Sequence, residues 1–284
     1  MEIKSIGIIG SGIMGHGIAQ VAAAAGIPVN LNDISNDVLD KARANIDKTL
    51  DKGIIKGKIN QDDKAAIFGR ISLECDLKKA VENVDLVVEA VPEDIELKNQ
   101  IFEKLDKFTQ SHAILASNTS QYSITEIASV VSEPSRVIGM HWFNPPIIMK
   151  LIEIVRALDT SDAVVESVRS FAAKVGKETV VCKDSTGFIS TRVLLALRLE
   201  CYRLLEEGVA SKEDIDKTLK LAFGHPMGQF ELADFSGLDI EVPSCESMTK
   251  VFGDRFRPPQ ALLQRVKAGR FGRKTGRGWY EYDQ

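Results

Sequence analysis

The 284-residue sequence predicts an α/β fold, a doubly wound sheet followed by an all-helical C-terminal domain. Three observations lead to this prediction. A short apolar strand at the start of the chain runs into a glycine-rich turn, short apolar strands then alternate with helical segments, and the alternation stops near residue 184. Strands that alternate with helices are typical of doubly wound sheets. We therefore expect a first domain over residues 1–185 and a helical second domain over residues 186–284.

The first part of the expected sheet lies before residue 92. Residues 3–9 form an apolar strand, and GSGIMG leads into an alanine-rich helix that ends near Gly26, because glycine is favoured just past a helix end. PVNLND is a second strand that ends at Asp33. Proline is favoured in the first turn of a helix, so we expect Pro92 to open the helix that reaches residue 108. Between Asp33 and Pro92 the pattern predicts helices within 35–68, a strand at 71–74, a short helix at 76–83 and a strand at 85–91.

The rest of the first domain continues the alternation, and the second domain is helical. Strands are expected at 113–118, 136–141, 151–157 and 178–184, and helices at 123–131 and 162–176. Ser123 with Glu126, and Ser211 with Asp214, fit a capping serine followed by an acid three residues later. Apolar helices in a small domain either pair with a second subunit or form only an internal core, and the sequence leaves both open. The expected helices of the second domain are 190–208, 211–224, 239–253 and 258–269.

Composition and charge exclude several classes of protein. Apolar residues make up 44% and charged residues 27%, as in ordinary soluble domains, and the formal net charge is −4. A chain with this charge has no overall attraction to nucleic acid or to an anionic membrane. The opening MEIKSIGIIG reads as a strand rather than a signal peptide. The sequence has no apolar run that approaches the roughly 18 residues needed to cross a bilayer.

The cysteines and histidines indicate neither disulfides nor a metal site. Widely spaced cysteines without a CxxC pair are typical of reduced thiols in the cytoplasm, which is where we expect the protein. The histidines show no metal-ligand spacing, so we expect no metal. The residues are Cys75, Cys182, Cys201 and Cys245, and His16, His112, His141 and His225.

The glycine-rich turn indicates a phosphorylated ligand. It reads G-x-G-x-x-G between a strand and a helix, as in Rossmann-like domains: the first glycine allows the tight turn, the second lets the backbone approach a pyrophosphate, and the third permits close helix packing. The amides at the helix start and the helix dipole favour phosphates. A plain glycine-rich turn is the alternative, which this context disfavours. The cofactor-binding residues expected here are Gly10, Gly12, Ile13, Met14 and Gly15.

Asp33 at the end of the second strand favours NAD as the dinucleotide. It lies where a carboxylate can accept hydrogen bonds from ribose hydroxyls, and it would repel a 2′-phosphate. The following segment, ISNDVLD, contains no arginine that would accommodate NADP. FAD shares the glycine fingerprint and remains the rival cofactor.

Three polar residues are candidates for the chemistry. Glu153 lies in the apolar strand LIEIV, where a carboxylate is costly unless it is paired, and His141 ends the preceding strand. A histidine held by a buried carboxylate is a good general acid or base, although each residue alone is more often structural. Ser120 follows the strand that ends at Asn118, and its hydroxyl can bind a reacting oxygen. A Ser–His hydrolase is disfavoured because the G-x-S-x-G elbow is missing from the sequence.

Taken together, the motifs resemble the 3-hydroxyacyl-CoA dehydrogenases, and most closely the short bacterial 3-hydroxybutyryl-CoA dehydrogenases. The resemblance runs nearly end to end, in the order of the family. The segments that carry it are GSGIMGHGIAQVAAAAG, SNTS, GMHWFNPP, KLIEIV, HPMG, DFSGLD and GRKTGRGWYEY.

The resemblance implies a cytoplasmic homodimer that acts in fatty acid or butanoate metabolism. Its reaction would be the reversible NAD-linked oxidation of an L-3-hydroxyacyl-CoA to the 3-ketoacyl-CoA. By position, His141 matches the family's catalytic base, Glu153 its carboxylate partner and Ser120 the serine that binds the substrate oxygen. Further matches near the cofactor are Glu93, Lys98, Asn144 and Lys274, beside the glycines and Asp33.

Some positions depart from the family pattern. Members usually read PGFVVNR where this chain reads TGFISTR, so Thr191 replaces the asparagine that helps hold the substrate carbonyl. Gln121 and Gln229 are further departures. Threonine cannot present an amide donor, so these changes indicate either a slow enzyme or a pocket reshaped for a different 3-hydroxyacyl group.

The basic residues Lys52, Lys56 and Lys58 have two interpretations. In the family a basic helical region here meets the CoA nucleotide, which would make Lys52 and Lys56 substrate-binding. Charge alone instead favours an ordinary solvated surface. Two rival functions stay open as well. One is a related NAD-linked hydroxy-acid dehydrogenase that acts on a substrate without CoA, and the other is a nucleotide-binding homologue without turnover.

Overall fold

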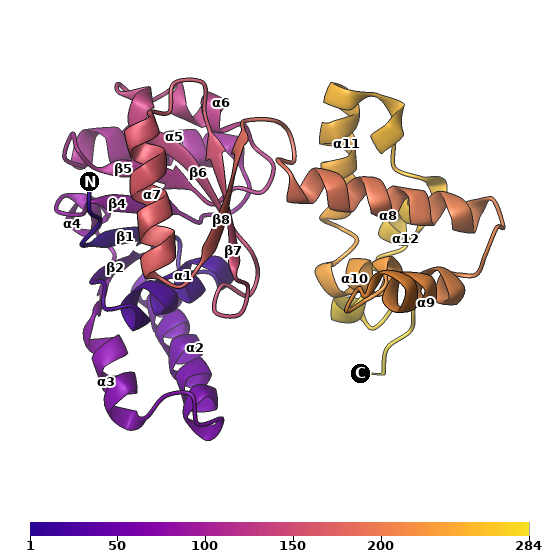
Figure 1. Cartoon of the computed structure of the whole chain (residues 1–284), viewed down its shortest axis with the longest axis horizontal. Helices are drawn as coiled ribbons and strands as arrows, with labels where there is room; N and C mark the ends of the chain where they lie inside the picture. The colour runs from indigo at the N-terminus through magenta and orange to yellow at the C-terminus, as the bar shows by residue number, and fades with distance from the viewer. Residues whose placement is uncertain (284) are drawn as a thin grey trace. The chain divides into compact units, whose positions relative to one another are not determined.

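The computed structural model describes residues 1–283, and the chain divides into two compact units, of which the first spans Met1–Ser185 and the second begins at Thr186 (Figure 1). The first unit is an α/β domain and the second is helical. Within residues 1–283, no helix is long and apolar enough to cross a membrane.

The first unit is built on a twisted sheet whose strands alternate with helices. Its strands are β1 Ile6–Ile9, β2 Val29–Asn32, β3 Ile71–Glu74, β4 Leu86–Glu89, β5 Ile114–Ser117, β6 Val137–Trp142, β7 Leu151–Arg156 and β8 Glu178–Lys183. Its helices are α1 Ile13–Ala24, α2 Asn36–Ile55, α3 Gln61–Gly69, α4 Leu77–Val81, α5 Ile95–Phe108, α6 Ile124–Ala128 and α7 Asp162–Lys174.

Across the described residues, the sheet has eight strands in the order β3-β2-β1-β4-β5-β6-β7-β8. All neighbouring pairs are parallel except β6 and β7, which are antiparallel. The strand order reverses between β1 and β4, and doubly wound sheets bind ligands beyond the carboxyl ends of the strands at such a point. The turns after β1, β4, β5 and β6 are therefore the ones to examine for a site.

Side chains along each strand point alternately to the two faces of the sheet, and different helices cover each face. Ile6, Ile8, Leu86 and Val88 belong to a core that also contains residues of α1, α2 and α7. The intervening strand residues point to the opposite face, where α4 contacts β1 and α6 contacts β6. The central strands β1, β4, β5 and β6 are buried on both faces, which explains their mostly apolar sequences.

Local hydrogen bonds shift some element bounds from those expected. The first strand begins at Ile6 rather than residue 3, because the amides of Lys4 and Ser5 donate to the Asp85 carboxylate. Pro92 does not open the next helix as expected. That helix, α5, begins at Ile95, since the Asp94 side chain accepts the amide of Leu97 and satisfies the helix start. Gly26 lies past the end of α1 with a φ of +84°, as predicted.

The second unit packs around an aromatic core. Tyr202 stacks on Trp279 with ring centroids 4.5 Å apart, and Phe230 contacts both rings. The sequence did not predict the short helix α10, which lies between Gly228 and Gly237. The helices are α8 Ser190–Glu206, α9 Lys212–Phe223, α10 Gln229–Ser236, α11 Glu241–Phe252 and α12 Gln260–Lys267.

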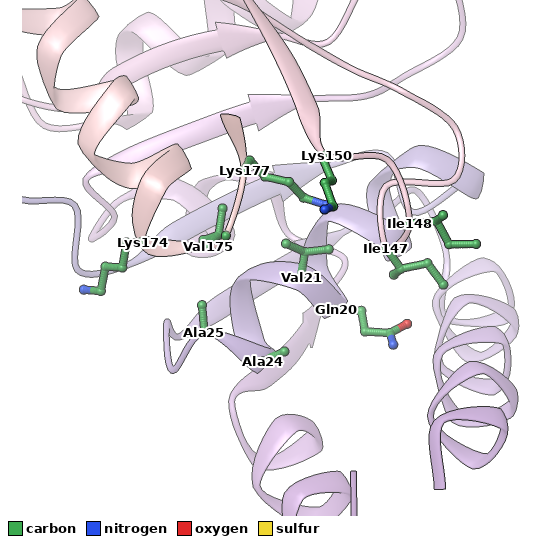
Figure 2. A pocket seen from close by; sticks show the side chains of 11 residues that line it. Gln20, Val21, Ala24, Ala25, Ile147, Ile148, Lys150, Lys174, Val175 and Lys177 are labelled. Atoms are coloured by element: carbon green, nitrogen blue, oxygen red, sulfur yellow. The ribbon is translucent and has the colours of Figure 1, made fainter. Parts of the chain in front are cut away.

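The loop over residues 143–150 joins the two antiparallel strands and is tied to the start of β8. The Lys177 ammonium donates to the carbonyl oxygens of Pro146 and Met149, both at 2.6 Å, and lies 5.8 Å from the centroid of the Trp142 ring. Burial lowers the pKa of Lys177. Figure 2 shows the hollow between α1 and this loop, with Val21 on the helix and Ile148 on the loop. One buried side chain thus fixes the path of a loop that follows β6.

Candidate active site

The turn after β1 has the shape needed to receive a pyrophosphate. Gly10 has a φ of +93°, which side-chain-bearing residues rarely adopt, and a Cβ on Gly15 would collide with the carbonyl oxygen of Gly10. At Gly12, a Cβ would meet nothing within 4 Å, so this backbone faces open space. The start of α1 therefore offers amides and open room, and both fit the phosphates of a dinucleotide.

Asp33 lies beside this turn, just past β2. Its Oδ2 accepts hydrogen bonds from the backbone N–H and the hydroxyl of Ser11, both at 2.7 Å, and its Oδ1 accepts the N–H of Ile34. The Ser11 bonds fix the carboxylate next to the glycine turn. An acceptor in this place fits ribose hydroxyls and disfavours a 2′-phosphate.

His141 and Glu153 form a buried pair across β6 and β7. They face each other in the antiparallel register, where directly opposite side chains meet. His141 Nδ1 lies 2.7 Å from Glu153 Oε2, and the residues are 8% and 1% exposed. Because the carboxylate accepts, the arrangement places the proton on Nδ1 and the lone pair of the neutral ring on Nε2. The Phe143 ring packs 4.6 Å from the histidine ring.

The neighbouring Cys182 thiol on β8 is uncharged beside this pair. Cys182 is paired in register with Val155, two residues from Glu153 on β7. Burial, with a contribution from the Glu153 charge, raises the pKa of Cys182 to about 11. The thiol is therefore protonated at neutral pH. Cys182 thus places no second negative charge next to the Glu153 carboxylate.

Ser120 lies in the turn after β5 and contacts Glu93. Its backbone N–H and its hydroxyl both donate to Glu93 Oε1, at 2.7 and 3.1 Å. Ser123, not Ser120, caps α6 by accepting the N–H of Glu126, as the sequence predicted. Asn118 links the two motif segments, since its side-chain oxygen accepts the N–H of Trp142 at 3.0 Å. The SNTS and HWFNPP segments thus lie side by side.

Glu93 and Lys98 are in contact, and sequence reasoning missed a third member of their cluster. The Lys98 ammonium lies 3.2 Å from Glu93 Oε2 and 2.8 Å from Oε1 of Glu89, a residue at the end of β4. Glu89 is fully buried. The sequence signal that could have found it is the one used for Glu153, a carboxylate inside an apolar strand.

The remaining predicted residues fall in three places. Asn144 is exposed in the loop that follows β6. Lys52, Lys56 and Lys58 line one hollow, at the end of α2 and in the loop after it, with Gln20, Ile59 and Ile148 among its other walls. Thr191 lies in the first turn of α8, and Lys274 forms an ion pair with Asp239; both belong to the second unit. Over residues 1–283, no group of three or more His, Cys, Asp or Glu side chains could hold a metal ion.

This arrangement in the first unit defines a class of enzyme. The glycine turn with Asp33 has a shape that fits a dinucleotide, and the His141–Glu153 pair lies at the end of β6, on the same edge of the sheet. A base held in this way can take a hydroxyl proton while the alcohol carbon gives up a hydride. Fold and site are therefore those of an NAD-linked dehydrogenase of alcohols.

Comparisons with known proteins identify the family. The chain belongs to the 3-hydroxyacyl-CoA dehydrogenases: the model of the NAD-binding domain matches residues 5–185 and that of the C-terminal domain residues 187–282. It is thus an NAD-dependent oxidoreductase of 3-hydroxyacyl-CoA. Both the predicted cofactor, NAD, and the predicted family are confirmed.

Individual relatives agree with this assignment. The chain is 43% identical over 285 residues to a probable 3-hydroxybutyryl-CoA dehydrogenase of Bacillus subtilis, covering 100% of this chain and 99% of that protein. The solved (S)-3-hydroxybutyryl-CoA dehydrogenase of Ralstonia eutropha matches with a TM-score of 0.97, 39% identity and 100% coverage of both chains. A solved NAD+-dependent dismutase, named as the 5-dehydrogenase of a pyridine carboxylic acid, matches with a TM-score of 0.81 and 32% identity, covering 99% of this chain and 91% of that one.

We expect Asp33→Ala to weaken NADH binding by about tenfold or more, because a hydrogen bond to a charged acceptor is worth roughly 1.5–3 kcal/mol. The preference for NADH over NADPH should shrink as well, since the charge that repels a 2′-phosphate is removed. Fluorescence titration with both cofactors measures this. Asp37→Ala, which removes an exposed carboxylate in the first turn of α2, is the matched control. Unchanged NADH affinity in Asp33→Ala would show that Asp33 serves only the Ser11 turn.

Proposed function

We propose that the chain oxidises a short-chain L-3-hydroxyacyl-CoA, with 3-hydroxybutyryl-CoA as the favoured substrate, in fatty acid or butanoate metabolism. The observation that carries the proposal is the buried His141–Glu153 contact at the edge that receives the dinucleotide. The relatives named 3-hydroxybutyryl-CoA dehydrogenases support the short acyl chain. The free thiols of all four cysteines, each within residues 1–283, support a cytoplasmic location.

In this proposal His141 is the general base and Glu153 orients it. The C3 hydroxyl proton passes to Nε2 as a hydride leaves C3, and the carbon–oxygen bond becomes that of a ketone. NAD, when bound, supplies the hydride acceptor. Glu153 fixes the ring through Nδ1 and stabilises the positive charge that develops on the imidazole. The residues of the first unit that would hold NAD are the glycine turn and Asp33, with Glu93, Lys98 and Asn144 as further contacts.

Ser120 is the proposed donor to the substrate oxygen. Its hydroxyl donates to Glu93, but its position is set independently by the backbone N–H bond to the same carboxylate. The hydroxyl can therefore turn from Glu93 to the substrate while the residue stays in place. A donor fixed before the reaction stabilises charge on the oxygen without further reorganisation.

The CoA portion is proposed to lie in the hollow lined by Lys52 and Lys56. These ammonium groups would pair with phosphates, while Leu50, Ile59 and Ile148 give the same hollow apolar walls. A CoA moiety combines phosphates with an extended, largely uncharged arm. This mixture of lining favours the interpretation of these lysines as substrate-binding rather than as a solvated surface.

A substrate without CoA is the second candidate function. Thr191 and Gln121 depart from the family pattern, and a relative of closely similar fold is named for a pyridine carboxylic acid. Such an enzyme would act equally well on a free keto acid and on its CoA ester.

The test of the proposed reaction is NADH consumption with acetoacetyl-CoA, with NADPH and free acetoacetate in parallel. We expect turnover with NADH and the CoA ester, and His141→Gln should lower kcat by about 10²–10⁴-fold while NADH affinity changes little, because only the proton transfer is lost. Equal rates with free acetoacetate would favour the second candidate. Loss of NADH binding in His141→Gln would mean that His141 is structural.

We expect Thr191→Asn to raise kcat with acetoacetyl-CoA by about tenfold, because an amide donor to the carbonyl is added. Thr249→Asn, the same exchange on α11, is the control and should leave the rate unchanged. A fall in kcat for Thr191→Asn would instead indicate that threonine is adapted to a different acyl group. Screening other 3-ketoacyl-CoA esters with both variants would then identify it.

The second unit is proposed to form a homodimer through α8 and α9. An apolar groove on these helices is lined by Leu204 and Leu219, and Phe223 at its edge is 69% exposed. Sedimentation velocity should give the mass of two chains. Phe223→Asp should shift the protein toward monomer, because a charge is then placed on the apolar contact. Phe235→Asp, at another exposed phenylalanine outside the groove, is the control; a monomeric wild type at micromolar concentration would refute the dimer.

A further inference from the structure

Glu89 is a wholly buried carboxylate for which the proposed reaction has no use. It ends β4 and is 0% exposed. Its Oε1 accepts the Lys98 ammonium and the N–H of Val91, both at 2.8 Å, and its Oε2 accepts the Ser117 hydroxyl at 2.6 Å. Three donors, one of them charged, compensate the burial of the carboxylate. Two of these contacts lead on to the turn that carries Ser120.

The first connection runs through Lys98. Its side chain is 1% exposed, and its ammonium bridges Glu89 to Glu93. The other oxygen of Glu93 accepts three hydrogen bonds: from the Ser120 N–H at 2.7 Å, the Ser120 hydroxyl at 3.1 Å and the Thr119 hydroxyl at 3.1 Å. Glu93 is itself about one-third exposed, and the buried Lys98 holds its second oxygen on the protein side. The order of contacts is Glu89, Lys98, Glu93, Ser120.

The second connection runs through Ser117, the last residue of β5. Its hydroxyl donates to Glu89 and accepts the N–H of Thr119 at 3.2 Å. This contact holds the same turn from its other end. Both connections start at the Glu89 carboxylate and meet at Thr119 and Ser120. The turn is thus held by side chains from the adjacent strands β4 and β5.

We infer that Glu89 is a positioning residue for Ser120, acting through Lys98 and Ser117 and touching neither substrate nor cofactor. Without the Glu89 charge, Lys98 would keep Glu93 as its one carboxylate partner and draw it away from the turn. The hydroxyl and amide of Ser120 would then lose their fixed acceptor. The catalytic part of this inference rests on the proposed function, whereas the ordering of the turn does not.

The experiment uses Glu89→Gln, which keeps the side chain's size and removes its charge. Hydrogen exchange of the segment 117–123 is followed by mass spectrometry, and kcat and NADH affinity are measured beside it. We expect the amides of Thr119 and Ser120 to exchange about tenfold faster or more, since their local opening becomes easier. We also expect kcat, measured at saturating NADH, to fall about tenfold; the NADH titration sets that concentration, because Lys98 and Glu93 are themselves proposed cofactor contacts.

A double-mutant comparison separates positioning from general damage. If Glu89 acts through the Ser120 hydroxyl, Glu89→Gln should lower kcat less than about twofold in a Ser120→Ala background. General destabilisation would lower kcat by the same factor in both backgrounds. Asp106→Asn is the matched control, because it removes a carboxylate of α5 that is likewise ion-paired, to Arg136, and hydrogen-bonded to a serine, Ser132. It should leave the exchange of 117–123 unchanged.

Several results would overturn the inference. Wild-type exchange of 117–123 in a folded Glu89→Gln variant would refute the ordering role, and equal effects in both Ser120 backgrounds would refute the catalytic one. If Glu89→Gln does not fold, Ser117→Ala cuts one connection alone and must still speed exchange at Thr119. A wild type that does not turn over acetoacetyl-CoA would refute the proposed substrate, while the exchange measurement would still decide whether Glu89 orders the turn.

Discussion

The first unit depends on hydrogen-bond donors that surround its buried carboxylates. Glu89 and Glu153 lie inside strands that are covered on both faces, and an ionised carboxylate in such surroundings costs several kcal/mol unless donors surround it. Glu153 is matched by His141 from the next strand, and Glu89 by Lys98 and Ser117. Each match fixes a polar group at the carboxyl edge of the sheet. The contacts that make the strands stable are therefore also the ones that place the reactive groups.

Much of this could be predicted from the sequence because its cause is local. The spacing of Gly10, Gly12 and Gly15 reflects steric requirements within a single turn. The structure shows a positive φ at Gly10, open space at Gly12 and no room for a Cβ at Gly15. The strand at residues 71–74 has the predicted bounds, since its alternation of apolar and polar residues is short and Asp76 soon caps the next helix. The contact between His141 and Glu153 was predicted from the cost of burying a charge, and the structure shows it at 2.7 Å; their catalytic roles stay predictions.

The features that could not be predicted depend on distant parts of the chain. The antiparallel direction of β7 follows from the loop at 143–150 returning beside β6, and strand periodicity carries no direction. The resemblance placed Lys98 near the cofactor, but nothing in the sequence paired it with Glu89, and only the fold brings the two together. The short helix α10 has little amphipathic pattern of its own, and its start is held by Asp216 of α9, whose carboxylate accepts the N–H groups of Phe230 and Glu231.

The Lys177 anchor has a thermodynamic consequence for ligand binding. Because its two hydrogen bonds hold the 143–150 loop before any ligand arrives, the conformational entropy of ordering that loop is lost during folding rather than on association. Binding at this edge then involves surfaces that are already rigid. Calorimetry on such a site would record a heat-capacity change set by the apolar area that the ligand covers, without the larger change that accompanies the folding of a segment.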